Sequence, residues 1–285
     1  MNSFEKNITF VIVSFKSSHI IEQCIKSINS SIKIIVVENS DNIYIKNYLE
    51  NKFSNVEVFI AKENLGYGKG NNLGISKVKT QYVFILNPDA ILEENCLGEL
   101  FKAHSILKDE FAILAPNYLN NYGFFSDQNS HLKKKEIMEV DFVKGFAMLI
   151  NLKKVTFDKI FDENFFLFLE EIDLCKRIKS KGEKIFVIQN SKVQHSEKHA
   201  SGDSFNIELC RNWHWMWSLF YYNYKHYGLF TAYKVTIPKL FSSLVKLFIA
   251  IILFNRKKFL IHYFRLRGLF NAFLKKSSWL RPDNI

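Results

Sequence analysis

The feature that most constrains the fold is a regular alternation, over the first ninety residues, of short apolar runs with segments of helical periodicity. The runs suit buried strands, and the segments between them are long enough for helices. Strands that alternate with helices predict an α/β fold with a mostly parallel central sheet and helices on both faces. The predicted strands are Thr9–Phe15, Lys33–Val37, Val56–Ile60 and Tyr82–Leu86.

The segments between these runs carry helix and turn signals. Ser17 and Ser18 are expected to cap a first helix, and Asp41 is expected to begin a second. A glycine-rich stretch, Asn64–Gly74, follows the third run and is expected to form a loop that approaches a ligand closely, with Asn71 near the start of the next helix. By itself this loop is a weak signal, because glycines also serve ordinary turns.

The fourth run stops at Asn87-Pro88-Asp89, where the proline blocks a helix. Asp89 therefore lies at the carboxyl end of a predicted strand, the edge at which open α/β sheets bind ligands. A carboxylate there is a suitable ligand for Mg²⁺ or Mn²⁺. Taken alone, a turn followed by a helix cap explains the tripeptide better.

Two common nucleotide-binding patterns are missing. The segment after the first strand, Val13–His19, contains no glycine, which excludes the dinucleotide fingerprint there. The chain also has no P-loop. If the sheet binds a nucleotide, it does so by another arrangement of strand-end residues.

Three motifs become specific in combination: Val36–Ser40, Asn64–Gly74 and Ile85–Ala90. In this order and spacing they resemble the family 2 inverting glycosyltransferases of the GT-A fold, in particular the rhamnosyltransferase-like branch. The resemblance covers roughly residues 8–225. It implies a GT-A domain over residues 1–225, with a nucleotide-binding half up to about residue 115 and an acceptor half after it.

The resemblance assigns residues to the nucleotide and the metal. Glu38, where Asp is usual, is expected to contact the base, and Asp89 the metal-bound diphosphate. His195 matches a histidine that contributes to the metal or diphosphate site, whereas His199 is a weaker candidate. Asn87 replaces the first acid of the usual Asp-x-Asp, which leaves fewer carboxylate ligands for the expected divalent metal, Mg²⁺ or Mn²⁺. The residues expected to bind the nucleotide are Ser14, Phe15, Glu38, Asn39, Asn64, Gly66, Gly70, Asn71 and Asn87.

The segment Phe161–Arg177 is similar to the family segment that ends in Glu-Asp-x-Asp-Leu. The resemblance makes Glu171, in place of the usual Asp, the catalytic base, with Glu170 and Asp173 as the neighbouring acids. The alternative is that these acids simply favour a helix N-terminus through the helix dipole. The phenylalanines that precede them favour the catalytic interpretation, because an aromatic wall raises the pKa of an adjacent carboxylate.

A later aromatic segment, residues 211–226, resembles a helix of the same branch. Arg211 or Lys225 is expected to pair with phosphate oxygens. The three tryptophans of this segment are explained equally well by core packing.

The excess of positive charge lies in the tail. Twelve Lys and Arg but one acid, Asp283, follow residue 224, so this segment accounts for the whole net charge of +11. Residues 226–285 are predicted to form basic amphipathic helices that lie on an anionic membrane surface. The apolar run Leu247–Phe254 is too short to span a membrane. A nucleic-acid-binding tail is the alternative, but lipid-linked acceptors favour the membrane, so no nucleic acid is expected as partner.

The sequence thus predicts an inverting transferase that moves a sugar from a dTDP- or UDP-sugar, for example dTDP-rhamnose, to a lipid-linked or surface polysaccharide acceptor. Widely spaced cysteines and the basic tail predict a cytoplasmic protein, peripheral on the inner face of the membrane. One alternative is a non-catalytic membrane-docking protein with a degenerate site, which Asn87 and Glu171 keep open. A sugar-nucleotide pyrophosphorylase is disfavoured, because its glycine-rich loop after the first strand is missing.

Overall fold

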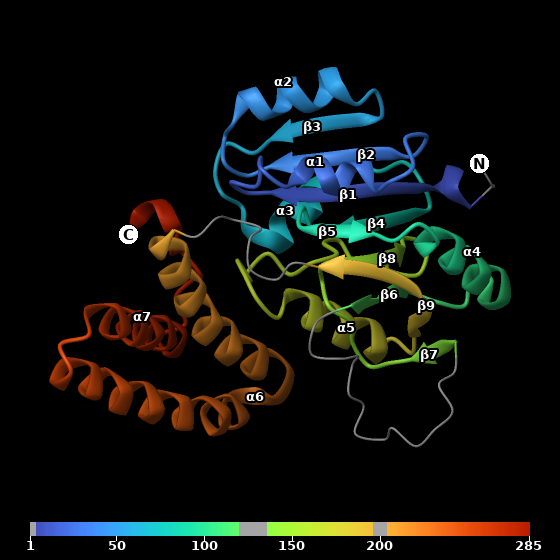
Figure 1. Ribbon diagram of the computed structural model, residues 1–285. Coiled ribbons are helices and arrows are strands. Elements are labelled where there is room, and N and C mark those ends of the chain that lie inside the picture. The colour runs from blue at the N-terminus through green and yellow to red at the C-terminus, as the bar shows by residue number, and fades with distance from the viewer. Residues whose placement is uncertain (1–3, 120–135, 196–203) are drawn as a thin grey trace. The chain divides into compact units, whose positions relative to one another are not determined.

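The structure is a computed structural model that describes residues 4–119, 136–195 and 204–285. The described strands join in a sheet with the order β3-β2-β1-β4-β8-β6-β9-β5, and β7 also pairs with β9 (Figure 1). The strands are β1 (Ile8–Ser14), β2 (Lys33–Glu38), β3 (Val56–Ile60), β4 (Tyr82–Leu86), β5 (Ala90–Leu92), β6 (Ile113–Leu119), β7 (Ile137–Glu139), β8 (Ala147–Asn151) and β9 (Ile185–His195).

The first four strands are parallel, as predicted, and their bounds agree with the prediction to within a residue or so. In this register Ser14, the last residue of β1, is the partner of Glu38, the last residue of β2. The carboxyl ends of these strands therefore share one edge of the sheet, which is where the sequence places its nucleotide-binding residues.

Beyond β4 the sheet is mixed. Strand β8 runs antiparallel to β4 and β6, and β5 and β7 run antiparallel to β9, while β6 and β9 are parallel. The α/β architecture is confirmed, but the prediction of a mostly parallel sheet describes only its first half. The prediction was argued from the alternation that contains β1 to β4, whereas each antiparallel pair includes β8 or β9 from later in the chain.

Helices cover both faces of the first half of the sheet. Alternate residues of β1 point to opposite faces. Phe10 and Ile12 join a core with apolar residues of α1, α2 and α4, whereas Val11 and Val13 face the glycines of α3. The helices are α1 (Ile21–Lys26), α2 (Ile43–Lys52), α3 (Gly66–Ile75), α4 (Cys96–Leu107) and α5 (Glu170–Ser180), with a short 3₁₀ turn, η1 (Glu5–Asn7), before β1.

The glycine-rich stretch is a helix and not the loop that the sequence predicts. Helix α3 contains Asn71 in its middle. A Cβ at Gly70 would lie 2.9 Å from Val13 Cγ1, and a Cβ at Gly74 would lie 2.4 Å from Val11 Cγ1. Glycine is unfavourable in an isolated helix by about 1 kcal/mol, but here it lets α3 approach the sheet closely, and this packing outweighs the propensity.

Two predicted helix caps are also corrected. Asn42, and not Asp41, caps α2, because its side chain accepts hydrogen bonds from the backbone amides of Tyr44 and Ile45. In α1 the carbonyl of Ser17, and not a serine hydroxyl, accepts from the first amides. The Ser17 hydroxyl instead accepts from the amide of Phe15.

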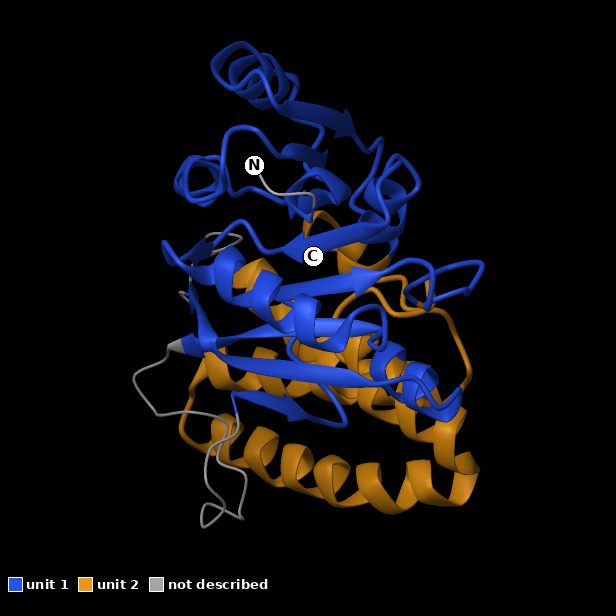
Figure 2. Cartoon of the chain, turned by 90° about the vertical axis from the view of Figure 1, so that its right-hand side faces the viewer, with its two compact units in different colours: residues 1–65, 69–161, 174–201 blue, residues 66–68, 162–173, 202–285 orange. Residues whose placement is uncertain are grey.

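The chain divides into two compact units (Figure 2). Unit 1 contains the sheet, and unit 2 contains the last two long helices together with two short segments from earlier in the chain. These units do not coincide with the linear boundaries at 115 and 225, which remain predictions about function. Unit 1 comprises residues 1–65, 69–161 and 174–201, and unit 2 comprises residues 66–68, 162–173 and 202–285.

Unit 2 is built on α6 (Phe205–Ile252) and α7 (Arg256–Phe273), and the chain ends in a 3₁₀ turn, η2 (Pro282–Asn284). Gly228, with φ +82°, interrupts α6, so the chain changes direction there (Figure 1). Helix α7 crosses α6 closely at Gly268, where a Cβ would lie 2.2 Å from the Trp213 carbonyl oxygen. Trp213 and Phe220 form the centre of the apolar core of this unit.

By length and composition, α6 could cross a membrane, contrary to the expectation from the sequence. An 18-residue window within it has a mean hydropathy of 1.9, and 17% of that window is buried. The sequence prediction considered only the run Leu247–Phe254, whereas most of this run continues a helix whose preceding residues are also largely apolar.

Candidate functional site

The first group of candidate residues lies at the carboxyl ends of β1 and β2 in unit 1. Glu38 is buried, and its Oε1 accepts hydrogen bonds from the amide of Ser40, at 2.8 Å, and from the Ser40 hydroxyl. The amide of Asn39 donates to the Ser14 carbonyl at 2.7 Å, which joins the two strand ends. Glu38 is therefore held in a fixed orientation at the edge where the sequence predicts that it contacts a base.

Helix α3 brings further candidates close to this edge. A Cβ at Gly70 would lie 3.2 Å from the Asn39 side-chain nitrogen, so any larger residue at position 70 would press on Asn39. Asn71 is buried next to it, whereas Asn64 and Phe15 are partly exposed. Gly66 belongs to unit 2, where its φ is +75° and a Cβ would lie 2.3 Å from the Phe166 carbonyl oxygen.

Asp89 and His195 form the second group in unit 1. Strand β5 pairs with β9 so that Ala90 is opposite His195, and this register places His195 Nε2 3.3 Å from Asp89 Oδ1. The His195 ring stacks on Phe146 with centroids 4.2 Å apart. Asn87 is fixed beside them, because its amide donates to the Phe146 carbonyl at 2.8 Å. The two residues predicted to serve the metal are therefore neighbours.

The Asp89 carboxylate has free capacity to bind a ligand. Its side chain is 3% exposed, and within the described residues Oδ1 has no hydrogen-bond partner, since the contact with His195 lies within ion-pair distance but lacks hydrogen-bond geometry. A buried acceptor without a partner is costly, so a bound cation would relieve it.

A carboxylate and an imidazole are suitable ligands for a divalent metal. The described residues contain no group of three or more His, Cys, Asp or Glu side chains that could hold a metal ion. Asp89 and His195 could therefore supply two ligands, and the remaining ligands would have to come from a substrate and water.

The acidic segment in unit 2 follows an unusual piece of backbone. Phe168 and Leu169 have φ values of +72° and +67°, a conformation that side chains other than glycine rarely adopt. Each such residue costs on the order of 1 kcal/mol or more, and strain of this kind concentrates at functional sites. The next residue begins α5, so the strained pair determines where Glu170, Glu171 and Asp173 lie in its first turn.

Asp173 is closely paired with the ammonium of a lysine and the imidazole of a histidine. Its side chain is completely buried, and Oδ1 lies 2.6 Å from Lys225 Nζ and 2.8 Å from His226 Nε2. Lys225 also donates to Asp162 Oδ2 at 2.7 Å. The contact with His226 was not predicted, because the two residues are far apart in the sequence.

The environment of Asp173 bears on two of the predicted roles, those of Asp173 and Lys225. Asp173 positions the start of α5 and the helix that carries Lys225, because its carboxylate is occupied by protein groups. Lys225 was expected to pair with phosphate, but its ammonium lies between two carboxylates. The other predicted phosphate ligand, Arg211, lies with its guanidinium 5.9 Å from the centre of the Phe168 ring.

Glu170 is buried, and burial is the main reason why its pKa is raised well above the ordinary value, with the charges of Glu171 and Asp173 adding to the effect. Its Oε2 has no hydrogen-bond partner within the described part of the chain. Glu171 is partly exposed. Of the three acids, Glu171 is thus the one that combines solvent access with a place in the first turn of α5.

The phenylalanines before α5 serve mainly as core. Phe165 is buried in the unit 2 core, with its ring 4.9 Å from that of Tyr221. Phe166 is also buried and accepts a hydrogen bond from the Tyr67 amide through its carbonyl. Trp213 and Trp217 are buried too, which agrees with the core-packing interpretation for two of the three tryptophans, whereas Trp215 is 38% exposed.

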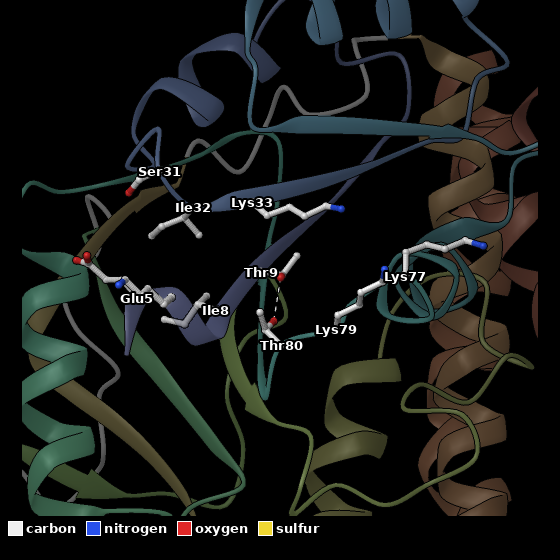
Figure 3. Close-up of a pocket in the computed structure, with 10 residues that line it drawn as sticks. Glu5, Ile8, Thr9, Ser31, Ile32, Lys33, Lys77, Lys79 and Thr80 are labelled. Atoms are coloured by element: carbon white, nitrogen blue, oxygen red, sulfur yellow. Dashed lines mark hydrogen bonds between the residues drawn. The ribbon is translucent and has the colours of Figure 1, made fainter. Parts of the chain in front are cut away.

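A cavity of about 190 Å³ lies away from all these residues (Figure 3). Its lining includes Ile8 and Thr9 at the start of β1 and Lys33 at the start of β2, and the Thr80 hydroxyl donates to Thr9 Oγ1 there. These are the amino ends of the parallel strands, whereas the predicted site residues are at the carboxyl ends. The cavity therefore does not form part of the candidate site.

One predicted site residue, His199, lies outside the described residues. The described residues nevertheless include every other predicted site residue. In unit 1 the register of the strands brings the nucleotide-binding and metal-binding candidates to strand ends, and in unit 2 the carboxylates gather in one helical turn.

Comparisons with solved structures agree with this fold. A mannosyltransferase from Pyrobaculum calidifontis, solved with GDP-Man and Mn²⁺, matches with a TM-score of 0.59 at 11% identity, over 96% of this chain and 89% of that one. GalNAc-T7, solved with UDP, GalNAc and Mn²⁺, matches with a TM-score of 0.57 at 15% identity, over 79% of this chain. This chain covers 51% of the GalNAc-T7 chain.

A family model identifies the family, and two curated sequences are similar to the chain. The low-salt glycan biosynthesis hexosyltransferase Agl10 of Haloferax volcanii is 24% identical over 67% of this chain and 67% of its own length. Rhamnosyltransferase WbbL of Escherichia coli K12 is 23% identical over 72% of this chain and 88% of its own length. The model of glycosyl transferase family 2 matches residues 9–167, more than half of the chain. The chain therefore belongs to glycosyl transferase family 2 and is a glycosyltransferase of the GT-A fold.

Proposed function

We propose that this chain transfers a hexose, with inversion at the anomeric carbon, from a nucleoside diphosphate sugar to a hydroxyl group of a lipid-linked or surface polysaccharide acceptor. The observation that carries the proposal is the buried Asp89 carboxylate at a strand end, with an unpartnered oxygen next to His195 among the described residues. The similarity to rhamnosyltransferase WbbL supports a dTDP-sugar such as dTDP-rhamnose as donor, with a UDP-sugar as the other candidate.

The nucleoside would bind at the carboxyl ends of β1 and β2. Glu38, held by Ser40, has the orientation and burial to accept a hydrogen bond from a base. Gly70 keeps α3 close enough to the sheet for Asn39 and Asn71 to line the same edge. Asn87 would also contact the nucleotide. It directly follows β4, at the position where the family usually has a carboxylate.

Asp89 and His195 would hold a divalent cation, Mg²⁺ or Mn²⁺, with diphosphate oxygens completing its coordination. The structural neighbours solved with Mn²⁺ support a divalent ion. When bound, the cation would neutralise charge on the departing diphosphate. The protein residues supply only two ligands, so the affinity for the metal should depend strongly on the nucleotide.

Glu171 would act as the catalytic base. It would take the proton of the acceptor hydroxyl while that oxygen bonds to the anomeric carbon. The bond from this carbon to the diphosphate oxygen breaks, and its electron pair leaves with the nucleoside diphosphate. Of the three acids, Asp173 is paired with Lys225 and His226, and Glu170 is buried with a raised pKa. Glu171, which is partly exposed, is therefore the acid that we assign to this role.

Thermal unfolding of the purified chain with Mn²⁺ and UDP, dTDP, GDP or CDP tests the proposed binding of nucleotide and metal. A ligand that binds the native state raises the melting temperature by mass action. We expect UDP or dTDP to stabilise the chain, more strongly with metal, and Asp89→Asn to lose at least tenfold in nucleotide affinity with metal present. Asp141→Asn, a change at a side chain that is 89% exposed, is the matched control. An unchanged response in Asp89→Asn would refute the role of Asp89.

We further propose that the chain is peripheral on the cytoplasmic face of the membrane, attached through its C-terminal helices. Large apolar side chains in the second half of α6 are exposed, among them Phe230 at 83% and Phe248 at 63%. Helix α7 folds back on α6, and Lys257 reaches Glu208 near the start of α6 at 3.0 Å. A hairpin held in this way favours attachment along the membrane surface over a straight span.

A further inference from the structure

The C-terminal segment, residues 276–285, packs against α6, and the proposed mechanism does not use it. Trp217 Nε1 donates to the Lys276 carbonyl at 2.9 Å, and His214 Nε2 forms a hydrogen bond of 2.8 Å with the Leu280 carbonyl. The Leu280 side chain is buried in the apolar core of unit 2. Hydrogen bonds and a buried side chain therefore hold the C-terminal segment in a fixed position.

From this position the C-terminal segment contacts residues 162–169, the segment that leads into α5. Both segments belong to unit 2 (orange in Figure 2). The Ser278 hydroxyl donates to the Asn164 carbonyl at 2.5 Å, and the Arg281 guanidinium lies 3.9 Å from the centre of the Phe166 ring. Arg281 Nη1 also donates to two carbonyls of its own segment, at 2.7 and 3.0 Å. Arg281 therefore joins the two segments, because it binds one and stacks on the other.

The segment before α5 is fixed at further backbone positions. The Phe166 carbonyl accepts a hydrogen bond from the Tyr67 amide at 3.0 Å, and the Leu167 carbonyl accepts one from the Ser218 hydroxyl at 2.8 Å. Together with the bond from the C-terminal segment, three carbonyls of residues 164–167 are thus bound by groups that are distant in the sequence. A strained backbone persists only where its surroundings determine it, so these contacts explain how the next two residues keep positive φ values.

The strained residues in turn determine where the proposed base lies. The Leu169 carbonyl accepts from the Asp173 amide at 2.8 Å, which begins the hydrogen bonding of α5, and Glu171 lies in the first turn of this helix. Displacement of a reacting group by about 1 Å can slow a reaction about a hundredfold. The activity of Glu171 should therefore depend on the contacts that hold residues 164–167.

We propose that Arg281 is a positioning residue for sugar transfer. By stacking on Phe166 and binding carbonyls of its own segment, it holds the segment before α5 so that Glu171 reaches the acceptor hydroxyl. This assignment rests on the proposed role of Glu171 as the base. Arg281 itself moves no proton, and it should affect the chemical step and not the binding of the nucleotide. Ser278 assists it through its single hydrogen bond to the same segment.

Hydrogen exchange tests the positioning without any transfer reaction. The amides of Tyr67 and Asp173 donate to carbonyls of the segment before α5, so Arg281→Ala should speed their exchange about tenfold. Arg267→Ala is the matched control, because that guanidinium also stacks on a ring of unit 2, at 5.3 Å from the centre of Phe264, and it should leave both amides unchanged. Unchanged exchange in Arg281→Ala would overturn the proposal.

Melting temperatures establish that these variants are folded. If Arg281→Ala does not fold, Ser278→Ala replaces it, since this change removes only the hydrogen bond to the Asn164 carbonyl. We expect exchange at the same two amides to become about threefold faster in Ser278→Ala. Ser277→Ala, at an exposed neighbour, is its control and should have no effect. Equal exchange in the two serine variants would contradict the proposal.

Transfer kinetics test whether Arg281 acts through Glu171. Arg281→Ala should lower kcat about ten- to a hundredfold, with the KM for the donor changed less than about threefold. In a chain that already carries Glu171→Gln, the same substitution should lower kcat less than about threefold further, because the base that it positions is gone. An equal loss in both backgrounds would overturn the proposal. Full activity in Glu171→Gln would instead refute the proposed base, and hydrogen exchange would still decide whether Arg281 fixes the segment.

Discussion

Two buried aspartates, one in each compact unit, show how identical side chains acquire different tasks. Asp89 in unit 1 is 3% exposed and keeps an oxygen without a hydrogen-bond partner among the described residues. Asp173 in unit 2 is completely buried and has an ammonium at 2.6 Å and an imidazole at 2.8 Å. A carboxylate that lacks a partner can receive a ligand, whereas one that is closely paired holds the structure in place.

The comparison extends to the acids next to Asp173. Both Glu170 and Glu171 lie in the first turn of α5, but Glu170 is buried with a raised pKa and Glu171 is partly exposed. Position in a motif is therefore insufficient to assign a role, because neighbours in the same turn have different environments. Substitutions at Glu171, Asp173 and Glu170 test whether the carboxylates differ in role as these environments indicate.

The largest effect is expected at Glu171. Glu171→Gln removes the proposed base without changing side-chain volume much, so kcat should fall by about 10²–10⁴, while the stabilisation by nucleotide and metal stays unchanged. The measurement is transfer from the donor that the nucleotide panel selects. Glu63→Gln, at a side chain that is 71% exposed, is the control and should retain full activity. Full activity in Glu171→Gln would remove Glu171 as the base.

The second largest effect is expected on the stability of the fold, from a substitution at Asp173. Asp173→Asn leaves the Lys225 ammonium and the His226 imidazole without their buried carboxylate partner, so the free energy of unfolding should fall by about 3 kcal/mol. Denaturant unfolding measures this. Glu208→Gln breaks the pair with Lys257, in which the side chains are 43% and 65% exposed, and should cost less than about 1 kcal/mol. Similar losses in the two variants would show that burial does not distinguish Asp173.

Features that depend on local sequence pattern, such as the first four strands and the position of Asp89, were predicted from the sequence. The first four strands were found because buried strands leave continuous apolar runs, and the shared edge of Ser14 and Glu38 follows from parallel pairing. Asp89 was found for the same reason, since it directly follows β4.

Contacts between distant parts of the chain could not be predicted from pattern. The closeness of Asp89 and His195 depends on the register of β5 with β9, and the pair of Asp173 with His226 depends on how α6 packs. Helix α3 was missed for a related reason. Its glycines indicate a loop by propensity, and only the close approach to Val11 and Val13 explains why they are tolerated in a helix.

The smallest effect is expected at Glu170, whose ionisation should make the free energy of unfolding depend on pH. Its folded-state pKa is raised, mainly by burial, so the folded chain keeps a proton there that the unfolded chain releases above about pH 4.5. The contribution of Glu170 to stability is therefore fully present below that pH and is lost as the pH rises through the folded-state pKa. Glu170→Gln, which stays neutral, should lessen this decline, so that its stability relative to the wild type improves from pH 4 to pH 8 in denaturant unfolding. A parallel decline in both proteins would mean that Glu170 is ionised in the folded chain, and the buried acid would then belong with Asp89 among the groups able to bind a cation.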